Sequence, residues 1–506
     1  MTRKHLAIAL AILALSLILR AWNLGEVPFG RDEFLDINAT VGYAKTGTWR
    51  AWDHNLGQVS ARVNPQSDAR AWIYRYQVAK LFDFLPPTEA VARSVSVFWG
   101  VVTTALVYLM GVSFTRRREA GLLAALFYAL SINALEIDRT LRMYAMFVPV
   151  FAALSWVMFS ALERAPYRSG FLRFLRSKTG LHFGFLLAAA VLGVLALELH
   201  LLAVNIAFAL FLFALLRMFS ADGRRYGIYL SAVVLAAGVS AWAIPEKFAQ
   251  ISAGLKFFEN HYAYLGIILR DFAHPLLGGL LIVWGWTALW RAGRRSEALW
   301  LAATVGGITL AAIFLWNRVV GKQYIAMVAP FVSVSVATGV YYLARYLESQ
   351  LYGRRVFAAI LLLALALVPN YGYFFAENNT YHITAAGDRP DYRKIFTYVK
   401  KNLVPGDVLV TRNFRNYYWS GAGVKVFDFG SERSAEALAR EGKVRKITRE
   451  YIAQIVAEHP SGWVIFSDND EKFISKEARA WMAENLRRLS HSALRGKVVV
   501  YRWGRE

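Results

Sequence analysis

Two adjacent carboxylates, Asp32 and Glu33, follow directly on the first strongly apolar stretch of the chain. Ionised side chains at the end of a membrane segment are costly to keep near lipid, which favours a functional role. A carboxylate in such a place can act as general base toward a hydroxyl group. An ordinary solvated acidic loop would contain the same pair, so the pair alone leaves both interpretations open. Asp36, three residues further on, is expected to be a bystander.

Other polar side chains interrupt the apolar pattern at three more places. They are Glu136, Asp138, Arg139 and Arg142, then Glu198 and His200, then Arg318, Lys322 and Tyr324. Cations in such places can hold a phosphate group, and Arg does so best because its forked guanidinium matches phosphate oxygens. Each candidate also has a plainer structural alternative. The arginines could extend to the membrane interface, His200 and Glu198 could satisfy backbone groups, Lys322 could be an ordinary loop lysine, and Asp138 could pair with Arg142.

The composition is that of a membrane protein. The 506 residues are 57% hydrophobic and only 18% charged, with a mean hydropathy of +0.35. The net charge of +23 comes from short basic clusters between apolar runs, which is typical of topology signals and contact with lipid headgroups rather than of nucleic-acid binding. The absence of cysteine excludes disulfides and Cys-ligated metals. The scattered histidines give no metal-ligand spacing, although a divalent ion held by acidic residues remains an alternative.

Eleven apolar runs are long enough to span a bilayer. They cover about 6–22, 91–113, 120–136, 143–162, 181–198, 200–217, 227–244, 275–290, 297–316, 324–344 and 356–375. The first has the basic start of a signal peptide but lacks a small-residue cleavage site, so we interpret it as an uncleaved span. The dense Lys/Arg clusters all fall on the side of the N-terminus, which is therefore predicted to be cytoplasmic. The candidate residues above then share the outer face of a multi-pass protein of the cell membrane.

The chain from about 376 onward changes character. Short apolar runs alternate with amphipathic helical segments, which predicts a small extracytoplasmic α/β domain over 376–506. It contains no glycine-rich phosphate loop and no nucleophile motif, so we expect a recognition or structural role. The transmembrane domain is predicted to cover 1–375, with a first outer loop at 23–90.

Several segments resemble one known family, the polytopic GT-C glycosyltransferases, in the branch of the lipid A aminoarabinose transferase and the protein O-mannosyltransferases. The first outer loop of that family opens with an acidic pair and closes with a G-x-W-like end. RRREAGLLAALFYALS is similar to its inner loop and third helix, and DYRKIFTYVKKNLVPGDVLV to its outer α/β domain. The matching positions are Asp32-Glu33 with Gly47-Thr48-Trp49; Arg93, Ser94, Val97 and Gly100; Arg142, Tyr144 and Ala145; and Lys322, Tyr324 and Pro330.

The resemblance implies an inverting transferase that takes a sugar from a polyprenyl-phosphate donor on the outer face. It implies Asp32 as general base, Glu33 as a residue that orients Asp32 or the acceptor, and Arg142 and Lys322, with Tyr324 beside them, as ligands of the donor phosphate. The acceptor would be a hydroxyl of a lipid, a glycan or a protein, and no cofactor would be required. We expect a monomer that contacts membrane lipids.

The chain departs from the family pattern after the G-x-W-like end. The aminoarabinose branch has a Lys-Pro pair that contacts the donor phosphate, where this chain has Asn64-Pro65. The missing cation would have to come from Arg62 or Arg70. The run before the R-x-Y-A segment also differs, which makes Glu136 or Asp138 a candidate second functional acid.

Two functions from other classes stay open. A transporter or flippase for a lipid-linked substrate would show inverted repeats or paired interrupted helices with charges at mid-membrane, and no such pairing is visible. A receptor or scaffold role for the outer domain would leave Asp32, Glu33 and Arg142 unexplained.

Overall fold

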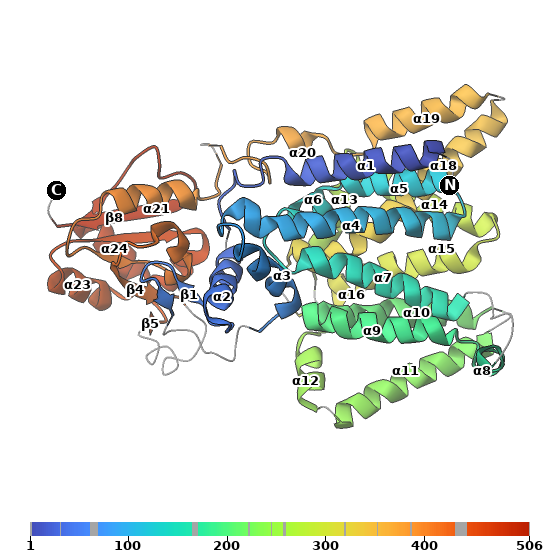
Figure 1. Cartoon of the computed structure of the whole chain (residues 1–506), viewed down its shortest axis with the longest axis horizontal. Coiled ribbons are helices and arrows are strands. Elements are labelled where there is room, and N and C mark those ends of the chain that lie inside the picture. The colour runs from blue at the N-terminus through green and yellow to red at the C-terminus, as the bar shows by residue number, and fades with distance from the viewer. Residues whose placement is uncertain are drawn as a thin grey trace. The chain divides into compact units, whose positions relative to one another are not determined.

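The chain forms two compact units in the computed structural model (Figure 1). The structure describes residues 3–30, 32–60, 69–163, 171–220, 223–243, 245–256, 260–317, 320–351, 353–384, 387–430 and 443–504. Unit 1 comprises Met1–Trp22 and Ser96–Tyr373, and unit 2 comprises Asn23–Val95 and Phe374–Glu506. Unit 2 therefore contains both the first outer loop and the C-terminal α/β elements.

The regular secondary structure in the described residues of unit 1 is helical, apart from isolated bridges. Its elements are α1 (Arg3–Ala21), α4 (Glu89–Thr115, which begins in unit 2), α5 (Arg118–Leu130), α6 (Ile132–Asp138), α7 (Tyr144–Glu163), α8 (Phe171–Thr179), α9 (Phe183–Leu199), η1 (Leu201–Asn205), α10 (Ile206–Met218), α11 (Gly223–Ala243), α12 (Pro245–Ala253), α13 (Ala263–Leu269), α14 (Pro275–Arg291), α15 (Arg295–Ala302), η2 (Ala303–Gly307), α16 (Ile308–Phe314), α17 (Lys322–Ile325), η3 (Ala326–Val328), α18 (Ala329–Gln350) and α19 (Arg354–Leu367). Helix α20 (Gly372–Phe375) lies where the chain passes into unit 2.

Each of the predicted apolar runs contains a helix, but the count of eleven spans is not confirmed. Among the described residues, six helical stretches are long and apolar enough to cross a membrane, or seven if the bent pair α5 and α6 forms one span. The pair bends by 61° at Ser131, whose hydroxyl accepts a hydrogen bond from Ala134 N and so caps α6. Helices α9 and α19 are apolar but shorter.

Buried polar contacts join α1, α4 and α6 inside unit 1. Arg20 Nε donates to Asp138 Oδ2 at 2.8 Å, and both side chains are fully buried. Ser16 and Thr104 exchange a hydrogen bond of 2.7 Å beside them. Gly100 of α4 lies against this pair, because a Cβ atom there would come within 2.6 Å of both Asp138 and Arg20. Hydrogen-bonded polar groups of this kind join helices in an apolar environment, where water cannot replace a lost partner.

Among the described residues, unit 2 contains a six-stranded sheet with the order β5-β4-β3-β6-β8-β7. Strands β3, β4, β5 and β6 are parallel, and β8 pairs antiparallel with both β6 and β7. The C-terminal elements are α21 (Tyr392–Lys401), β3 (Val408–Val410), η4 (Asn413–Trp419), β4 (Lys425–Phe429), β5 (Lys443–Val444), α23 (Arg449–Glu458), β6 (Gly462–Ser467), η5 (Asp468–Phe473), α24 (Lys476–Asn485), β7 (Arg487–Arg488) and β8 (Val498–Trp503). The alternation of helix and strand expected from the sequence is therefore present, and Asp391, Thr448 and Ser475 cap the starts of helices α21, α23 and α24.

The first outer loop supplies the rest of unit 2. It folds into α2 (Glu33–Thr46), the short strands β1 (Trp52–Asp53) and β2 (Gln58–Val59), and α3 (Trp72–Phe82). Helix α2 ends at Gly47, whose φ of 69° is the left-handed conformation that glycine adopts most readily. Its Gly42 packs so close to the returning chain that a Cβ atom there would lie 1.7 Å from Arg50 O.

Candidate functional site

Asp32 occupies the N-terminal cap position of α2 and is exposed to solvent. Its backbone carbonyl accepts from Leu35 N at 3.1 Å and from Asp36 N at 3.3 Å, which fixes the residue at the helix start. Asp32 is therefore held in place by its backbone while its side chain remains accessible.

Glu33 is buried and forms a two-pronged ion pair with Arg93 of α4. Arg93 Nε and Nη2 donate to the two carboxylate oxygens of Glu33, each at 2.8 Å. The remaining N–H groups donate to the carbonyls of Leu24, Val27 and Pro28 at 2.7–3.1 Å. All five guanidinium donors are used, so one side chain organises the turn that precedes Asp32. Because both of its carboxylate oxygens accept hydrogen bonds from Arg93, Glu33 stabilises the start of α2 next to Asp32.

In unit 1, the carboxylate of Glu136 forms ion pairs with two cations, Lys322 and Arg270, and the three side chains make an ion-pair cluster. Glu136 Oε2 accepts from Lys322 Nζ at 2.6 Å and from Arg270 Nη2. Arg270 Nε donates to Asn133 Oδ1 at 2.8 Å, which orients the guanidinium. Tyr373 contributes its hydroxyl to Glu136 Oε1 at 3.4 Å. The cluster carries a net positive charge, and half of the Lys322 side chain is exposed.

Three of the predicted residues, Arg142, His200 and Tyr324, contact Tyr144, the first residue of α7. Arg142 lies over the ring of Tyr144, with its guanidinium carbon 5.7 Å from the ring centroid. The Tyr144 hydroxyl is 3.2 Å from His200 Nε2, and the Tyr324 ring contacts both Tyr144 and His200. His200 Nδ1 accepts from Leu202 N and so also caps η1, as its plainer alternative predicted. The structure thus brings Arg142, His200 and Tyr324 together from three separate segments.

The remaining candidate residues either make contacts that stabilise the fold or lie exposed. Asp138 pairs with Arg20 rather than with Arg142. Arg139 Nη1 donates to the carbonyls of Leu19 and Arg20, at the C-terminal end of α1 where backbone carbonyls lack helical partners. Glu198 lies exposed near the end of α9. Arg62, Asn64, Pro65 and Arg318 lie outside the described residues, and Arg70 is exposed before α3.

Sequence reasoning missed Arg270 and gave Arg93 no role. Arg270 and Asp271 are charged neighbours between two apolar stretches on the predicted outer side, which is the signal that singled out the other candidates. Arg93 was part of the quoted R-x-x-S pattern, but its partner Glu33 is 60 residues away, and only the fold brings them together. No group of three or more potential metal ligands (His, Cys, Asp or Glu) occurs among the residues that the structure describes.

Comparison with known proteins decides the fold. No model of a protein family matches the chain, and no curated protein matches its sequence. Among solved structures, ArnT from Cupriavidus metallidurans in the apo state superposes with a TM-score of 0.59 at 13% identity, covering 99% of this chain and 98% of that chain. ArnT is a lipid A aminoarabinose transferase with the GT-C fold. This chain has the GT-C fold.

Two further structures extend the likeness. ArnT from the same organism bound to undecaprenyl phosphate has a TM-score of 0.56 at 14% identity, with 99% of this chain and 98% of that chain covered. The apo oligosaccharyltransferase of Archaeoglobus fulgidus has a TM-score of 0.58 at 14% identity, covering 92% of this chain and 70% of that chain. The GT-C resemblance found in the sequence is therefore confirmed at the level of fold, and unit 1 has the multi-pass helical character of a membrane protein.

Proposed function

We propose that this protein is an inverting glycosyltransferase that moves a sugar from a polyprenyl-phosphate donor to a hydroxyl group of a cell-envelope lipid, glycan or protein. The observation that carries the proposal is the exposed carboxylate of Asp32, held at a helix start by a turn that uses all five donors of Arg93. The similar structures support the substrate class, since one is an ArnT bound to undecaprenyl phosphate and another an oligosaccharyltransferase in complex with a dolichol-phosphate and an inhibitory peptide.

The proposed reaction is a single in-line displacement. The acceptor oxygen attacks the anomeric carbon of the sugar from the face opposite the phosphate while Asp32 accepts the hydroxyl proton. The bond between the anomeric carbon and the phosphate oxygen breaks, and its electron pair leaves with the polyprenyl phosphate. The configuration at the anomeric carbon is inverted. The leaving group is a stable anion and needs no general acid, so one carboxylate suffices where a glycosidase uses two.

Cations of unit 1 would hold the donor phosphate. Arg142, Lys322 and Tyr324 are the residues expected from the sequence, and the ion-pair cluster adds Arg270 through Glu136. Glu136 keeps the two cations together in the absence of substrate, and a phosphate could exchange with it as their partner. Arg62 remains a further candidate for this role. The positive charge is supplied by side chains, so we propose that no cofactor is required; a divalent ion held by acidic residues is the alternative.

The proposed setting is the outer face of the cell membrane. The distribution of basic clusters predicts a cytoplasmic N-terminus and an α/β domain outside, where lipid-linked donor and acceptor would meet. We propose that the chain acts as a monomer.

The direct test uses the purified full-length chain in liposomes with polyprenyl-phosphate sugars that carry a radiolabel in the sugar. Wild type is expected to move label to an acceptor fraction from the cell envelope and to release polyprenyl phosphate. Asp32→Asn, which keeps the shape and removes the base, is expected to lower turnover at least about 100-fold. The matched control is Asp83→Asn at an exposed ion pair with Lys80. Donor binding or transbilayer movement by wild type without release of polyprenyl phosphate would overturn the proposal in favour of a transporter.

A further inference from the structure

The α/β sheet of unit 2 has a topological switch point beside β3. The chain leaves β3 for its parallel neighbour β4 on one side, and later returns to its parallel neighbour β6 on the other. In open sheets of this kind, ligands bind outside the carboxyl ends of the strands that flank the switch point. The segment that follows the carboxyl end of β3 is η4, so η4 and its surroundings are where a ligand of this domain would be expected.

Helix α2 of the first outer loop packs against this place. Phe34 is completely buried, with its ring centroid 5.5 Å from that of Tyr392 and 5.9 Å from that of Phe414. Asn38, one turn further along α2, donates from Nδ2 to Phe414 O at 2.9 Å. Phe34 is two residues after Asp32. The expected ligand-binding edge of the α/β sheet is therefore engaged by the helix that begins with the proposed base.

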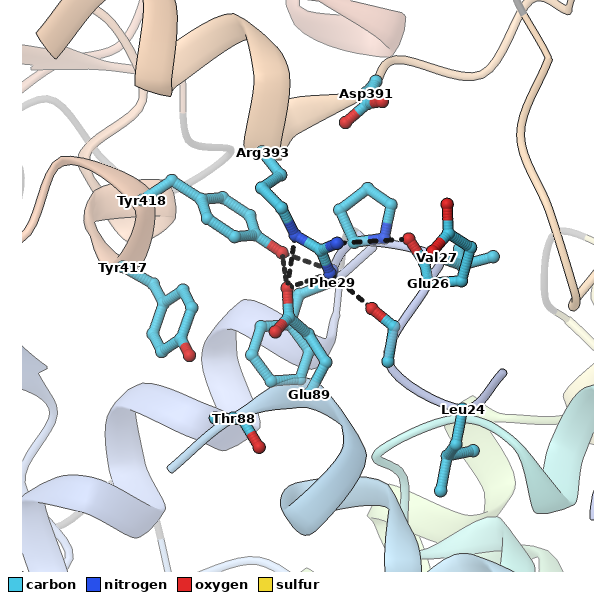
Figure 2. Close-up of polar contacts among 12 residues, drawn as sticks. Leu24, Glu26, Val27, Phe29, Thr88, Glu89, Asp391, Arg393, Tyr417 and Tyr418 are labelled. Atoms are coloured by element: carbon cyan, nitrogen blue, oxygen red, sulfur yellow. Dashed lines mark hydrogen bonds and ion pairs between the residues drawn. The ribbon is translucent and has the colours of Figure 1, made fainter. Parts of the chain in front are cut away.

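Tyr418 of η4 makes the polar link to the turn before Asp32 (Figure 2). Its hydroxyl oxygen accepts from Phe29 N at 2.7 Å, and its O–H donates to Glu89 Oε1 at 2.7 Å. Burial and the neighbouring charge of Glu89 raise the pKa of Tyr418 well above its usual value, so the hydroxyl stays protonated and keeps both bonds. Phe29 is fully buried, and its amide would be left without this acceptor if the hydroxyl were removed.

Arg393 of α21 reinforces the same link. Its Nη2 donates to Glu89 Oε1 at 2.6 Å (Figure 2). The same Nη2 donates to Gly25 O at 2.6 Å. Arg93 holds the carbonyls of Leu24, Val27 and Pro28, so the two arginines bind different groups of one turn. The amide of Phe29 is bound by Tyr418. Arg93 therefore holds part of this turn, and Tyr418 and Arg393 of the α/β domain hold the rest.

We infer that the carboxyl edge of the α/β sheet is a docking site for the chain's own first outer loop, and that Tyr418 is a positioning residue for Asp32. The inference rests on the proposed function for the role of Asp32, while the docking itself does not. Tyr418 is not proposed to touch substrate; it acts through the Phe29 amide on Asp32, three residues later in the chain. The α/β domain then holds the proposed base, Asp32, in position rather than recognising a sugar or nucleotide.

The consequence is a specific kinetic signature. Loss of the Tyr418 hydroxyl frees the Phe29 end of the turn and lets Asp32 move from its place, and a displacement of about 1 Å from productive geometry costs on the order of 100-fold in rate. Donor binding depends on other residues. We therefore expect Tyr418→Phe to lower kcat by about 10- to 100-fold and to leave the KM for the donor within about twofold.

The experiment compares Tyr418→Phe with Tyr398→Phe in the full-length chain. Tyr398 makes the matched control because it lies on α21 of the same domain and contacts Trp463 and His491 rather than the loop. Two quantities are measured, the kcat and KM of transfer and the hydrogen exchange of backbone amides over residues 24–36. We expect faster exchange at Phe29 and its neighbours, by at least about tenfold, and unchanged exchange in β3 and β6.

The hydrogen exchange tests the docking, and the kinetics test the role of Tyr418, so each measurement can contradict one part of the inference. If exchange over 24–36 in Tyr418→Phe equals that in Tyr398→Phe, the docking inference is wrong whatever the activity. If exchange rises while kcat stays at the control value, Tyr418 does not position Asp32. If wild type transfers no sugar, the proposed function fails, and the exchange result still decides the docking. Glu89→Gln, which keeps an oxygen for the Tyr418 hydroxyl, is the second variant and is expected to fall between wild type and Tyr418→Phe in both measurements.

Discussion

Asp32 and Glu33 are adjacent in sequence yet stand in opposite environments. Asp32 is exposed at the helix start, whereas Glu33 is buried with both oxygens bound to Arg93. The sequence singled out the pair and left open whether Glu33 orients Asp32 or the acceptor. It could not assign the pairing with Arg93, because a buried ion pair depends on a contact between residues 60 positions apart. Breaking such a pair from one side leaves an uncompensated buried charge, which is strongly destabilising.

The cations around Glu136 lead to a prediction about donor affinity. Arg270→Gln removes a guanidinium that is oriented by Asn133 and faces the same carboxylate as Lys322. If these cations hold the donor phosphate, the KM for the polyprenyl-phosphate sugar should rise about tenfold or more, since a charge-assisted hydrogen bond contributes about 1.5–3 kcal/mol. Initial rates over a range of donor concentrations measure this. Lys394→Gln, at a half-exposed lysine of α21, is the control. An unchanged KM in Arg270→Gln would remove Arg270 from the phosphate site.

At the scale of elements, hydrophobic patterning predicted most of what forms. The strands at Val408–Val410 and Gly462–Ser467 are short apolar runs, and the helices at Tyr392–Lys401 and Lys476–Asn485 are amphipathic. Patterning failed where a local polar contact divides an apolar run. The predicted span at 120–136 is broken at Ser131, because the Ser131 hydroxyl caps a new helix and also donates to Asp271 Oδ2 at 2.7 Å.

Packing of α4 against α1 and α6 depends on Gly100. An added methyl group there would lie 2.5 Å from Asp138 Cγ and 2.6 Å from Arg20 Nε, so Gly100→Ala must separate the buried ion pair. We expect a loss of about 1–3 kcal/mol in stability, as for overpacking in other close-packed interiors. Thermal unfolding in detergent measures it. Gly279→Ala in α14, where a Cβ atom meets nothing within 4 Å, is the control. Equal melting temperatures for the two variants would contradict the packing seen here.

His54 makes the contact between β1 and η4 sensitive to pH. Burial, and next the charge of Lys45, lower the pKa of His54 from 6.5 to about 4. Its backbone N donates to Asn416 Oδ1 at 3.1 Å, and its ring lies against Tyr417. Above pH 6.5 the imidazole is neutral in both the folded and the unfolded chain. Between about pH 6.5 and 4 only the unfolded chain binds the proton, so stability falls as pH falls, by about 1.4 kcal/mol per pH unit.

Melting curves of the full-length chain at pH 7 and pH 5 test this linkage. His54→Gln should lower stability at pH 7 and reduce the difference between the two pH values. His491→Gln, at an exposed histidine, should keep the wild-type difference. A pH dependence that is the same in His54→Gln as in wild type would show that His54 titrates normally in the folded chain.

At the scale of the whole molecule, the sequence predicted a multi-pass GT-C protein with a C-terminal α/β part, and the fold agrees over 99% of the chain. It did not predict that residues 23–95 share a unit with residues 374–506. The links between these segments, such as Tyr418 with Phe29 and Arg393 with Glu89, join residues more than 300 positions apart and leave no periodic pattern. Hydrophobic periodicity locates elements, whereas their grouping depends on side-chain contacts of this kind.

Sugar transfer is the central claim, and mass spectrometry of cell-envelope lipids, glycans and proteins tests it most directly. The comparison needs cells with the wild-type chain, cells without it, and cells with Asp32→Asn at equal expression. We predict one class of envelope molecule that carries an added sugar in wild type and lacks it in the other two. Identical spectra from all three cells, or the full modification in cells with Asp32→Asn, would contradict the account.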